Sequence, residues 1–423
     1  MSYPDSLQTW LARLERLHPS AIALGLDRVR RVWQAMALAP CFPVVIVGGT
    51  NGKGSVCAML DAILCAAGYR TGRYTSPHLL RYNERVRIGG REASDAELVT
   101  AFGEVDAARG DTSLTYFEFG TLAAMAQFVA ADVDIAILEV GLGGRLDAVN
   151  VFDADVALVT TVDLDHQDYL GDTREVIGFE KAGIYRAGRP AICADPAPTA
   201  SLVAHARAIG ADLRLLGREF FHETAGDGWT YRGLTVNWPE LPPPALAGSF
   251  QLRNAAAALA VLEALRERLP VDVAAICAGL RAVVVPGRFQ RIASAPETIV
   301  DVAHNPEAAR ALAATLREGP ACGRTLAVVG MLADKDALGV VAALADTVEA
   351  WWVCTPDSPR ALPAARLAEV VRSRAPEVPL WIEADVRGAL AAARGEARED
   401  DRIIVFGSFY TVAAVLDHAA TQQ

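Results

Sequence analysis

The chain has 423 residues, 52% of them hydrophobic, which is enough for two or three domains with sizeable cores. Its 51 acidic residues outnumber 40 basic ones, and the formal charge of −11 argues against a broad nucleic-acid-binding surface. No uninterrupted apolar stretch is long enough to cross a membrane, and the seven scattered cysteines contain no C-x-x-C pair. We therefore expect a cytoplasmic protein with buried free thiols.

The N-terminal part is predicted to form two helices and a strand. Residues 5–17 and 27–38 carry apolar residues at helical spacing with charges between them. The β-branched run at 43–47 then predicts a buried strand.

A glycine-rich turn follows this strand and is the most informative segment of the chain. It consists of Gly49, Thr50, Asn51, Gly52, Lys53, Gly54 and Ser55, and a helical pattern follows it. Glycines let backbone N–H groups point at an anion, and a helix N-terminus adds partial positive charge. Lys53 is placed to reach phosphates and Ser55 to offer a hydroxyl to Mg²⁺, although an intervening glycine breaks the usual phosphate-loop pattern. A plain structural turn is the alternative, but the lysine and serine after a strand favour nucleotide binding.

Polar residues near other strand ends are candidates for metal or phosphate contacts, because ligands of an open parallel sheet bind beyond the carboxyl ends of its strands. The predicted strand at 134–140 contains Glu139, a carboxylate suited to Mg²⁺. The strand at 155–161 leads to His166, and Ser76 closes an earlier strand. The alternatives are a helix cap or surface ion pair for Glu139, a solvated side chain for His166, and local backbone hydrogen bonds for Ser76.

Lys181 stands among apolar and small residues, so partial burial is conceivable. Burial lowers the pKa of a lysine and favours the neutral amine, which reacts with carbon dioxide. From the residues alone, a solvated surface charge is the favoured alternative.

The chain changes character after residue 218. Residues 219–250 are rich in aromatics and include three consecutive prolines, which predicts a small β excursion. Helices are expected at 253–268 and 271–282, and Pro286 with Gly287 marks a hinge.

We therefore expect an α/β protein of two domains. Residues 1–285 should form a P-loop-containing, parallel-sheet ATP-binding domain, and residues 286–423 a smaller Rossmann-like α/β domain. Strands of the second domain are expected at 298–303, 325–330, 350–354, 378–382 and 402–406.

Three residues of the second domain are further candidates. Arg288 follows the hinge, and Asp301 and His304 stand at the end of the first strand. An ion pair for the arginine and a helix cap for the Asp-x-x-His motif are the structural alternatives. Equally, Arg288 would suit a phosphate and Asp301 a nucleotide or metal, and the residues alone leave this open.

Seven motifs occur in order along nearly the whole chain. They are GTNGKGS at 49–55, SPHL at 76–79, EVGLGGRLD at 139–147, DH at 165–166, KAGI at 181–184, PGRF at 286–289 and DVAHNP at 301–306. Together they resemble the folylpolyglutamate synthase family, within the Mur-ligase superfamily of ATP-dependent amide-forming ligases. Residues 17–22 and 113–120 further resemble the bacterial bifunctional dihydrofolate synthases/folylpolyglutamate synthases.

The resemblance implies that ATP phosphorylates a carboxylate of a pteroyl substrate and that L-glutamate attacks the resulting acyl phosphate. The implied substrates are dihydropteroate, which gives dihydrofolate, and reduced folates, which give polyglutamates. ATP and two Mg²⁺ ions are the implied cofactors. We expect a monomer without nucleic-acid or membrane partners.

The resemblance also implies roles for individual residues. Contacts to ATP are expected from the residues of the 49–55 loop, including Lys53, and from Asn254, Arg288 and Asp301, with His304 close to them. Ser55, Ser76 and Glu139 would hold one Mg²⁺, and His166 and a carbamylated Lys181 the other. The candidate catalytic residues are Lys53, His166, Lys181 and His304. The candidate substrate contacts are Ser20, Ala21, Tyr116, Phe117, Asp147 and Ala148, within pocket segments 17–28 and 113–121.

Two positions depart from the family pattern. Val149 replaces a threonine before Asn150, and Phe179 replaces a polar or basic residue before Glu180. Neither removes a predicted metal or phosphate group, but they leave the fine shape of the pterin pocket open. Three alternative functions remain: a monofunctional folylpolyglutamate synthase, a peptidoglycan-building Mur ligase, and a nucleotide-binding switch without ligase activity. The peptidoglycan enzymes carry a further domain before the loop, for which the 47 residues before Gly48 leave no room.

Overall fold

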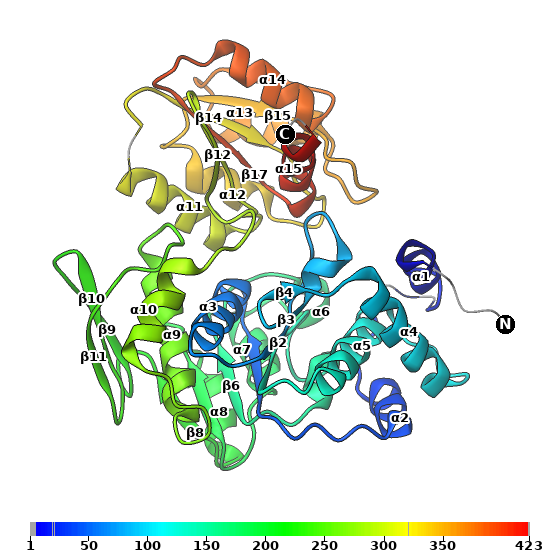
Figure 1. The fold of residues 1–423 in the computed structure, drawn as a ribbon. Helices are drawn as coiled ribbons and strands as arrows, with labels where there is room; N and C mark the ends of the chain where they lie inside the picture. Colours follow the sequence, from blue (N-terminus) through cyan, green and yellow to red (C-terminus); the bar gives the residue numbers. More distant parts are fainter. Residues whose placement is uncertain (1–5, 19, 21, 320, 422–423) are drawn as a thin grey trace. The chain divides into compact units, whose positions relative to one another are not determined.

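The computed structural model describes residues 6–18, 20, 22–319 and 321–421 (Figure 1). Its contacts divide the chain into two compact units, Met1–Ala245 with Leu252–Val283, and Leu246–Gln251 with Val284–Gln423. The stretch 246–251, which the sequence placed in the first domain, groups instead with the second unit. One reason is that the Ser249 N–H donates a hydrogen bond to the Glu318 carboxylate, at 3.1 Å.

The first unit is built on an eight-stranded sheet of order β4-β3-β2-β5-β1-β6-β7-β8. Its strands are β1 (Val44–Gly48), β2 (Thr71–Tyr74), β3 (Val86–Ile88), β4 (Arg91–Glu92), β5 (Ile135–Glu139), β6 (Val156–Val159), β7 (Pro190–Cys193) and β8 (Asp212–Leu215). All neighbours from β2 to β8 in this order pair in parallel, and β3 pairs antiparallel with both β2 and β4. The expected parallel-sheet α/β class is therefore confirmed. Because β1 lies between β5 and β6 and is buried on both faces, it carries the glycine turn to the middle of the carboxyl edge.

Helices of the first unit connect and cover these strands. They are α1 (Leu7–Leu14), α2 (Asp27–Met36), α3 (Lys53–Ala66), α4 (Asp95–Arg109), α5 (Tyr116–Ala130), α6 (Gln167–Leu170), α7 (Arg174–Ala182), α8 (Ala200–Ala208), α9 (Phe250–Leu265) and α10 (Val273–Ala282). α5 begins at a capping box, in which Thr115 accepts the Glu118 N–H and Glu118 accepts the Thr115 N–H. α3 packs against α10, where Gly279 lies directly on the backbone of Ile63.

The predicted β excursion is confirmed. β9 (Phe221–Ala225), β10 (Gly228–Arg232) and β11 (Asn237–Leu241) form a separate antiparallel sheet of three strands (Figure 1). The Tyr231 hydroxyl, 2.8 Å from the Glu263 carboxylate, ties this sheet to α9.

The second unit has a six-stranded sheet of order β12-β13-β17-β14-β15-β16. Its strands are β12 (Gln290–Ser294), β13 (Glu297–Val300), β14 (Thr325–Val329), β15 (Ala350–Val353), β16 (Leu380–Ile382) and β17 (Arg402–Phe406). The helices are α11 (Pro306–Glu318), α12 (Ala337–Leu344), α13 (Ala364–Arg374), α14 (Val386–Glu396) and α15 (Phe409–Thr421). All strand pairs are parallel except β12 with β13, so the expected mostly parallel sheet is confirmed.

Two composition-based expectations can also be compared with the fold. Within the described ranges, no helix combines the length and apolar character needed to cross a bilayer. All seven cysteines are free, but burial is only partly confirmed. Cys57, Cys193 and Cys354 are buried, whereas Cys41 and Cys322 are exposed because they lie in loops.

Candidate active site

The glycine turn between β1 and α3 is a tightly packed loop. Gly49 and Gly52 have φ angles of +140° and +86°, in the region that favours glycine. A Cβ atom on Gly49 would collide with the Thr160 hydroxyl, and one on Gly52 would lie 2.7 Å from Asn254 Oδ1. Thus the loop conformation needs glycine at both positions, and Asn254 lies directly beside it.

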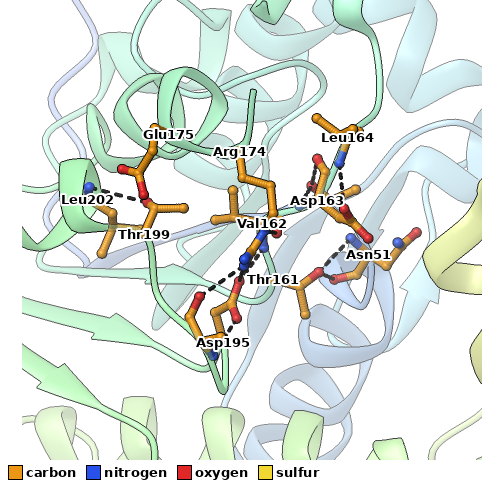
Figure 2. Close-up of polar contacts among 12 residues, drawn as sticks. Asn51, Thr161, Val162, Asp163, Leu164, Arg174, Glu175, Asp195, Thr199 and Leu202 are labelled. Carbon is orange, nitrogen blue, oxygen red and sulfur yellow. Dashed lines mark hydrogen bonds and ion pairs between the residues drawn. The ribbon is translucent and has the colours of Figure 1, made fainter. Parts of the chain in front are cut away.

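The loop is hydrogen-bonded along its length to the segment that follows β6. Thr50 Oγ1 donates to the Asp163 carbonyl (3.1 Å) and accepts the Asp163 N–H (3.0 Å), while the Thr50 N–H donates to the Thr161 carbonyl (2.7 Å). The Asn51 carbonyl accepts from Thr160 Oγ1 (2.6 Å), and its N–H donates to Thr161 Oγ1 (3.2 Å; Figure 2). The loop is therefore positioned by the neighbouring strand end.

Lys53 opens α3 and bends back over the loop. Its Nζ donates to the carbonyls of Gly49 (3.0 Å) and Thr50 (3.1 Å). An ammonium group and a helix N-terminus thus stand at one loop, an arrangement that attracts an anion.

Glu139, at the end of β5, lies beside the first turn of α3. The Ser76 N–H donates to Glu139 Oε2 at 3.1 Å, and a Cβ on Gly54 would lie 3.8 Å from both carboxylate oxygens. Glu139 and the adjacent Ser55 are 5% and 3% exposed. Since Gly52 is the N-cap residue of α3, Glu139 does not cap that helix, and its side chain is buried instead of lying at the surface. The structure therefore brings Glu139, Ser76 and the start of α3 together.

His166 and Lys181 belong to neighbouring segments, because α6, which follows His166, packs against α7, which carries Lys181. His166 immediately precedes α6, with φ of +51°, and its Nε2 lies 3.9 Å from Asp165 Oδ1. Lys181 is in the last turn of α7 and is only 4% exposed. The favoured expectation of a surface lysine is therefore wrong, and the burial that carbamylation requires is present.

Asp147 and Phe117 meet at the loop that follows β5. The Asp147 carboxylate accepts the N–H groups of Leu142 (2.8 Å) and Val149 (3.1 Å), and burial raises the pKa of Asp147 to about 7. A Cβ on Gly141 would lie 2.7 Å from Phe117 Cζ, so the phenyl ring covers this loop directly. Ala148, the next residue after Asp147, is also buried.

Tyr116 belongs to an aromatic group that the sequence did not predict as a unit. The Arg85 guanidinium carbon lies 5.5 Å from the Tyr116 ring centre and 5.4 Å from that of Tyr82. Arg85 Nε donates to His78 Nδ1 at 2.8 Å, and burial, followed by the charge of Arg85, lowers the pKa of His78 to about 4. His78 is therefore a neutral acceptor at neutral pH.

The two segments expected to form a pteroyl pocket lie side by side. Ser113 Oγ donates to the Leu17 carbonyl at 3.1 Å. Arg28 bridges the segments, donating to the Ala23 carbonyl (2.6 Å) and the Glu118 carboxylate (2.9 Å).

Individual residues of these segments differ in position. Ser20 is exposed, and its backbone N–H and carbonyl both lie within hydrogen-bonding distance of the His18 ring. Ala21, a candidate substrate contact, lies outside the described residues. Phe119 is fully buried and packs edge-on to core aromatics such as Phe102, so its role is core packing.

Two of the three candidates of the second unit, Arg288 and His304, lie close to Phe409. The Arg288 guanidinium carbon and the His304 ring centre lie 5.8 Å and 6.1 Å from its ring centre. Asp301 accepts two backbone N–H groups, and burial raises its pKa against the opposing charge of Arg288. Because Asn305 caps α11, the helix-cap alternative for Asp301 is wrong.

Several residues at these sites escaped the sequence analysis. Thr160 and Thr161 hold the glycine turn in place, and their only signal in the sequence was a pair of hydroxyls at the end of a buried strand. Arg85 sits between two tyrosines, and Arg174 pairs with Asp195 across the sheet edge. Such pairings depend on tertiary contacts, so no local pattern marked them.

Three features define the class of two-unit, Mur-type ligases. They are the glycine loop with Lys53, the buried carboxylate beside it and the second α/β unit. The family comparisons agree, since the Mur ligase middle domain matches residues 47–262 and the Mur ligase, glutamate ligase domain, matches residues 287–409. The dihydrofolate synthase/folylpolyglutamate synthase of Escherichia coli (strain K12) is 43% identical over 412 residues, covering 97% of this chain and 95% of that protein. The chain belongs to the dihydrofolate synthase/folylpolyglutamate synthase family, whose members are ATP-dependent glutamate ligases.

Solved structures are similar over the full length. E. coli FolC in complex with DHPP and ADP has a TM-score of 0.94 at 43% identity, covering 100% of this chain and 99% of that chain. The bifunctional enzyme from Yersinia pestis, complexed with AMPPNP and Mn ion, has a TM-score of 0.92 at 45% identity, covering 100% of both chains. A bifunctional folylpolyglutamate synthase/dihydrofolate synthase with Mn, AMPPNP and L-glutamate bound has a TM-score of 0.91 at 44% identity, again covering 100% of both chains.

Proposed function

We propose that this protein ligates L-glutamate to dihydropteroate, forming dihydrofolate, and to reduced folates, forming polyglutamates, with ATP as the energy source. The observation that carries the proposal is the convergence of the glycine loop, Lys53 and the Glu139 carboxylate on the first turn of α3. The ADP, AMPPNP, Mn, DHPP and L-glutamate in related structures support it. We further propose a cytoplasmic monomer.

ATP is proposed to bind with its phosphates on the glycine loop. Backbone N–H groups from Gly49 to Ser55 would face the phosphates, and the Lys53 ammonium would move from the loop carbonyls onto phosphate oxygens. Asn254 lies beside Gly52 and is a candidate for a further contact to the nucleotide. Arg288, Asp301 and His304 are our candidates in the second unit.

The residues around Glu139 fit one Mg²⁺ ion. Within the described ranges no group of three or more His, Cys, Asp or Glu side chains could hold a metal. Mg²⁺ does not need such a group, because it keeps several waters and takes only one or two carboxylates together with phosphate oxygens. Glu139, Ser55 and Ser76 would supply the protein oxygens. When bound, the ion offsets the negative charge that develops on the transferred phosphoryl group.

Lys181 and His166 are our candidates for a second ion. An unmodified lysine ammonium repels a cation, whereas a carbamate on Nζ would present a carboxylate. The burial of Lys181 at 4% exposure supports this modification, because burial favours the neutral amine that reacts with carbon dioxide. His166 would contribute a neutral ring nitrogen.

The pteroyl substrate is proposed to bind where the 17–28 and 113–121 segments meet the loop after β5. Tyr116, Phe117 and the protonatable Asp147 supply flat apolar faces and a hydrogen-bonding group, as a heteroaromatic ring requires. Ser20, Ala21 and Ala148 remain proposed contacts.

The chemistry then needs positioning more than a protein nucleophile. The substrate carboxylate attacks the γ-phosphorus of ATP, ADP leaves, and an acyl phosphate forms. The amine of L-glutamate attacks the acyl carbon, and inorganic phosphate leaves as the amide bond forms. Lys53 stabilises charge on the transferred phosphoryl group throughout the first step.

Substrate-dependent phosphate release tests the proposal. We expect release from ATP only when a pteroyl substrate and L-glutamate are both present, at one phosphate for each amide formed. Lys53→Met, which keeps the aliphatic stem, is the matched variant and should lose this release while remaining folded. Phosphate release that needs neither substrate would instead support the nucleotide-switch alternative.

A further inference from the structure

An arginine–aspartate pair that the proposed reaction does not use holds the loop after β6 from both sides (Figure 2). Arg174 Nε donates to the Val162 carbonyl at 2.7 Å, and the Val162 N–H donates to Asp195 Oδ2 at 2.7 Å. The same carboxylate oxygen lies 3.2 Å from Arg174 Nη2. Both backbone polar groups of Val162 are therefore satisfied by the pair.

The pair is itself well supported. Asp195 follows β7, its side chain is 5% exposed, and its Oδ1 accepts the Ala197 N–H at 2.8 Å. Arg174 Nη2 also donates to the Ala197 carbonyl at 2.9 Å. Hydrogen bonds between charged partners are stronger than neutral ones, and the forked guanidinium fixes their direction.

The residues on either side of Val162 hold the phosphate loop. The Thr161 carbonyl accepts the Thr50 N–H, and Asp163 exchanges two hydrogen bonds with the Thr50 hydroxyl. A displacement of Val162 would therefore displace the anchor of the phosphate loop.

Arg174 is also the first residue of α7, the helix that carries Lys181 in its last turn. The adjacent Glu175 accepts the Ala200 and Ser201 N–H groups at the start of α8, so the first turn of α7 is fixed on that side too. Arg174 thus joins two structures, the anchor of the phosphate loop and the helix of Lys181.

We propose that Arg174, oriented by Asp195, is a positioning residue that sets the phosphate loop and the His166 segment relative to Lys181, and so determines the affinity for ATP and divalent metal. This rests on the nucleotide and metal sites of the proposed function. Arg174 touches neither the nucleotide nor the metal in this account. Its effect passes through the backbone of Val162.

The opposite end of the same sheet offers a matched control. Asp155, just before β6, accepts the Val44 N–H (2.9 Å) and pairs with Arg268 (2.8 Å). This pair also joins a carboxylate, an arginine and a strand-end N–H group, but at the amino edge of the sheet. A purely structural role predicts similar consequences for both pairs.

The experiment compares Arg174→Gln, Arg174→Lys, Asp195→Asn and the double variant Arg174→Gln/Asp195→Asn with Arg268→Gln and Asp155→Asn. For each full-length protein, the half-saturating concentrations of ATP and Mg²⁺, the KM for L-glutamate, the Tm, and ADP binding by calorimetry are measured. We expect about a tenfold rise in the ATP and Mg²⁺ values for Arg174→Gln and Asp195→Asn, the size typical when partners of metal-site residues are removed. The KM for glutamate should stay near the wild-type value. Arg174→Lys should be intermediate, since it keeps the charge but loses the fork.

Two comparisons separate an effect on the position of the binding-site residues from an effect on the stability of the fold. The double variant should be no worse than the more impaired single variant, because the two residues act as one unit. The Arg268 and Asp155 variants should change Tm without changing the ATP or Mg²⁺ values. Unchanged values in the Arg174 and Asp195 variants, or equal changes in the control pair, would overturn the proposal. If Arg174→Gln does not fold, the ATP and Mg²⁺ values of Arg174→Lys and Asp195→Asn test the proposal by the same criteria. Failure of the proposed function itself is distinct, since the wild type would then show no phosphate release that depends on a pteroyl substrate and L-glutamate.

Discussion

Thr50 and Asp163 are joined by two hydrogen bonds through one hydroxyl, which donates to the Asp163 carbonyl at 3.1 Å and accepts the Asp163 N–H at 3.0 Å. This contact fastens the phosphate loop after β1 to the segment after β6. Neither residue lies within a strand, so no backbone hydrogen bonds of the sheet join them. The Thr50 side chain links the two segments instead.

Replacing Thr50 by valine removes this link while nearly conserving shape. We expect Thr50→Val to raise the KM for ATP about 30-fold, since two hydrogen bonds of about 1 kcal/mol each are lost. Thr50→Ser keeps the hydroxyl and is the control, with a KM near that of the wild type. Steady-state kinetics at saturating glutamate and pteroyl substrate measure both, and equal KM values in the valine and serine variants would contradict the role of the hydroxyl.

Carbamylation of Lys181 leads to a rescue experiment. Lys181→Ala should be inactive, because the buried carboxylate proposed for the second ion would be missing. Small carboxylates such as formate or acetate should restore part of the activity by entering the vacated space. Full activity of Lys181→Ala without added carboxylate would refute the modification, as would an unmodified Lys181 in clear density with Mg²⁺ bound nearby at neutral pH.

The raised pKa of Asp147 predicts that the free energy of unfolding depends on pH. Its pKa is raised from 3.8 to about 7 by burial, so between these values the folded protein binds a proton that the unfolded chain has released. The contribution of Asp147 to the free energy of unfolding therefore falls as pH rises through this window, by at most about 1.4 kcal/mol per pH unit. Urea unfolding of wild type and Asp147→Asn at several pH values should show this slope only in the wild type.

The control for that measurement is Asp153→Asn. The Asp153 side chain is 92% exposed and pairs with Arg186 at the surface. The Asp153→Asn variant should therefore have the same pH slope of the unfolding free energy as the wild type. A slope that survives in Asp147→Asn would show that another group causes it.

Phe117 allows a test of the pteroyl pocket that leaves the nucleotide site intact. Its ring lies on Gly141 and 5.7 Å from the Tyr74 ring centre. We expect Phe117→Ala to raise the KM for pteroyl substrates about tenfold, as for loss of a buried aromatic contact, with the KM for ATP unchanged. Phe221→Ala, on the separate β9–β11 sheet, is the control. Equal increases for ATP and pteroyl substrate would place Phe117 outside the pocket.

Local patterns in the sequence were sufficient for the parts of the site that depend on neighbours along the chain. Gly49 and Gly52 adopt positive φ angles, and Lys53 opens a helix, so the predicted strand–turn–helix arrangement is present. Glu139 ends a buried strand, and parallel topology alone placed it at the carboxyl edge of the sheet. The principal strands were also predictable, since they are continuous apolar runs.

Contacts between distant residues could not be predicted from such patterns. The approach of Asn254 to Gly52 and the pairing of Arg174 with Asp195 exist only once the sheet order is established. For Lys181, a solvated surface charge was the favoured expectation because a lone lysine is normally exposed, yet the residue is buried in the fold. Phe119 follows Phe117 by two residues on a helix, so its ring points in a different direction and is fully buried in the core.

The most direct test of the central claim is a glutamate-ligation assay with dihydropteroate and with a reduced folate, analysed by mass spectrometry of the products. We predict that the wild type adds glutamate to both substrates with ADP and phosphate as co-products. Folded Lys53→Met should lose both activities by about 100-fold or more, because removal of one charge-stabilising group costs several kcal/mol of barrier. Ligation to reduced folates but never to dihydropteroate would contradict the bifunctional assignment, and near-normal turnover by Lys53→Met would contradict the phosphate-loop mechanism.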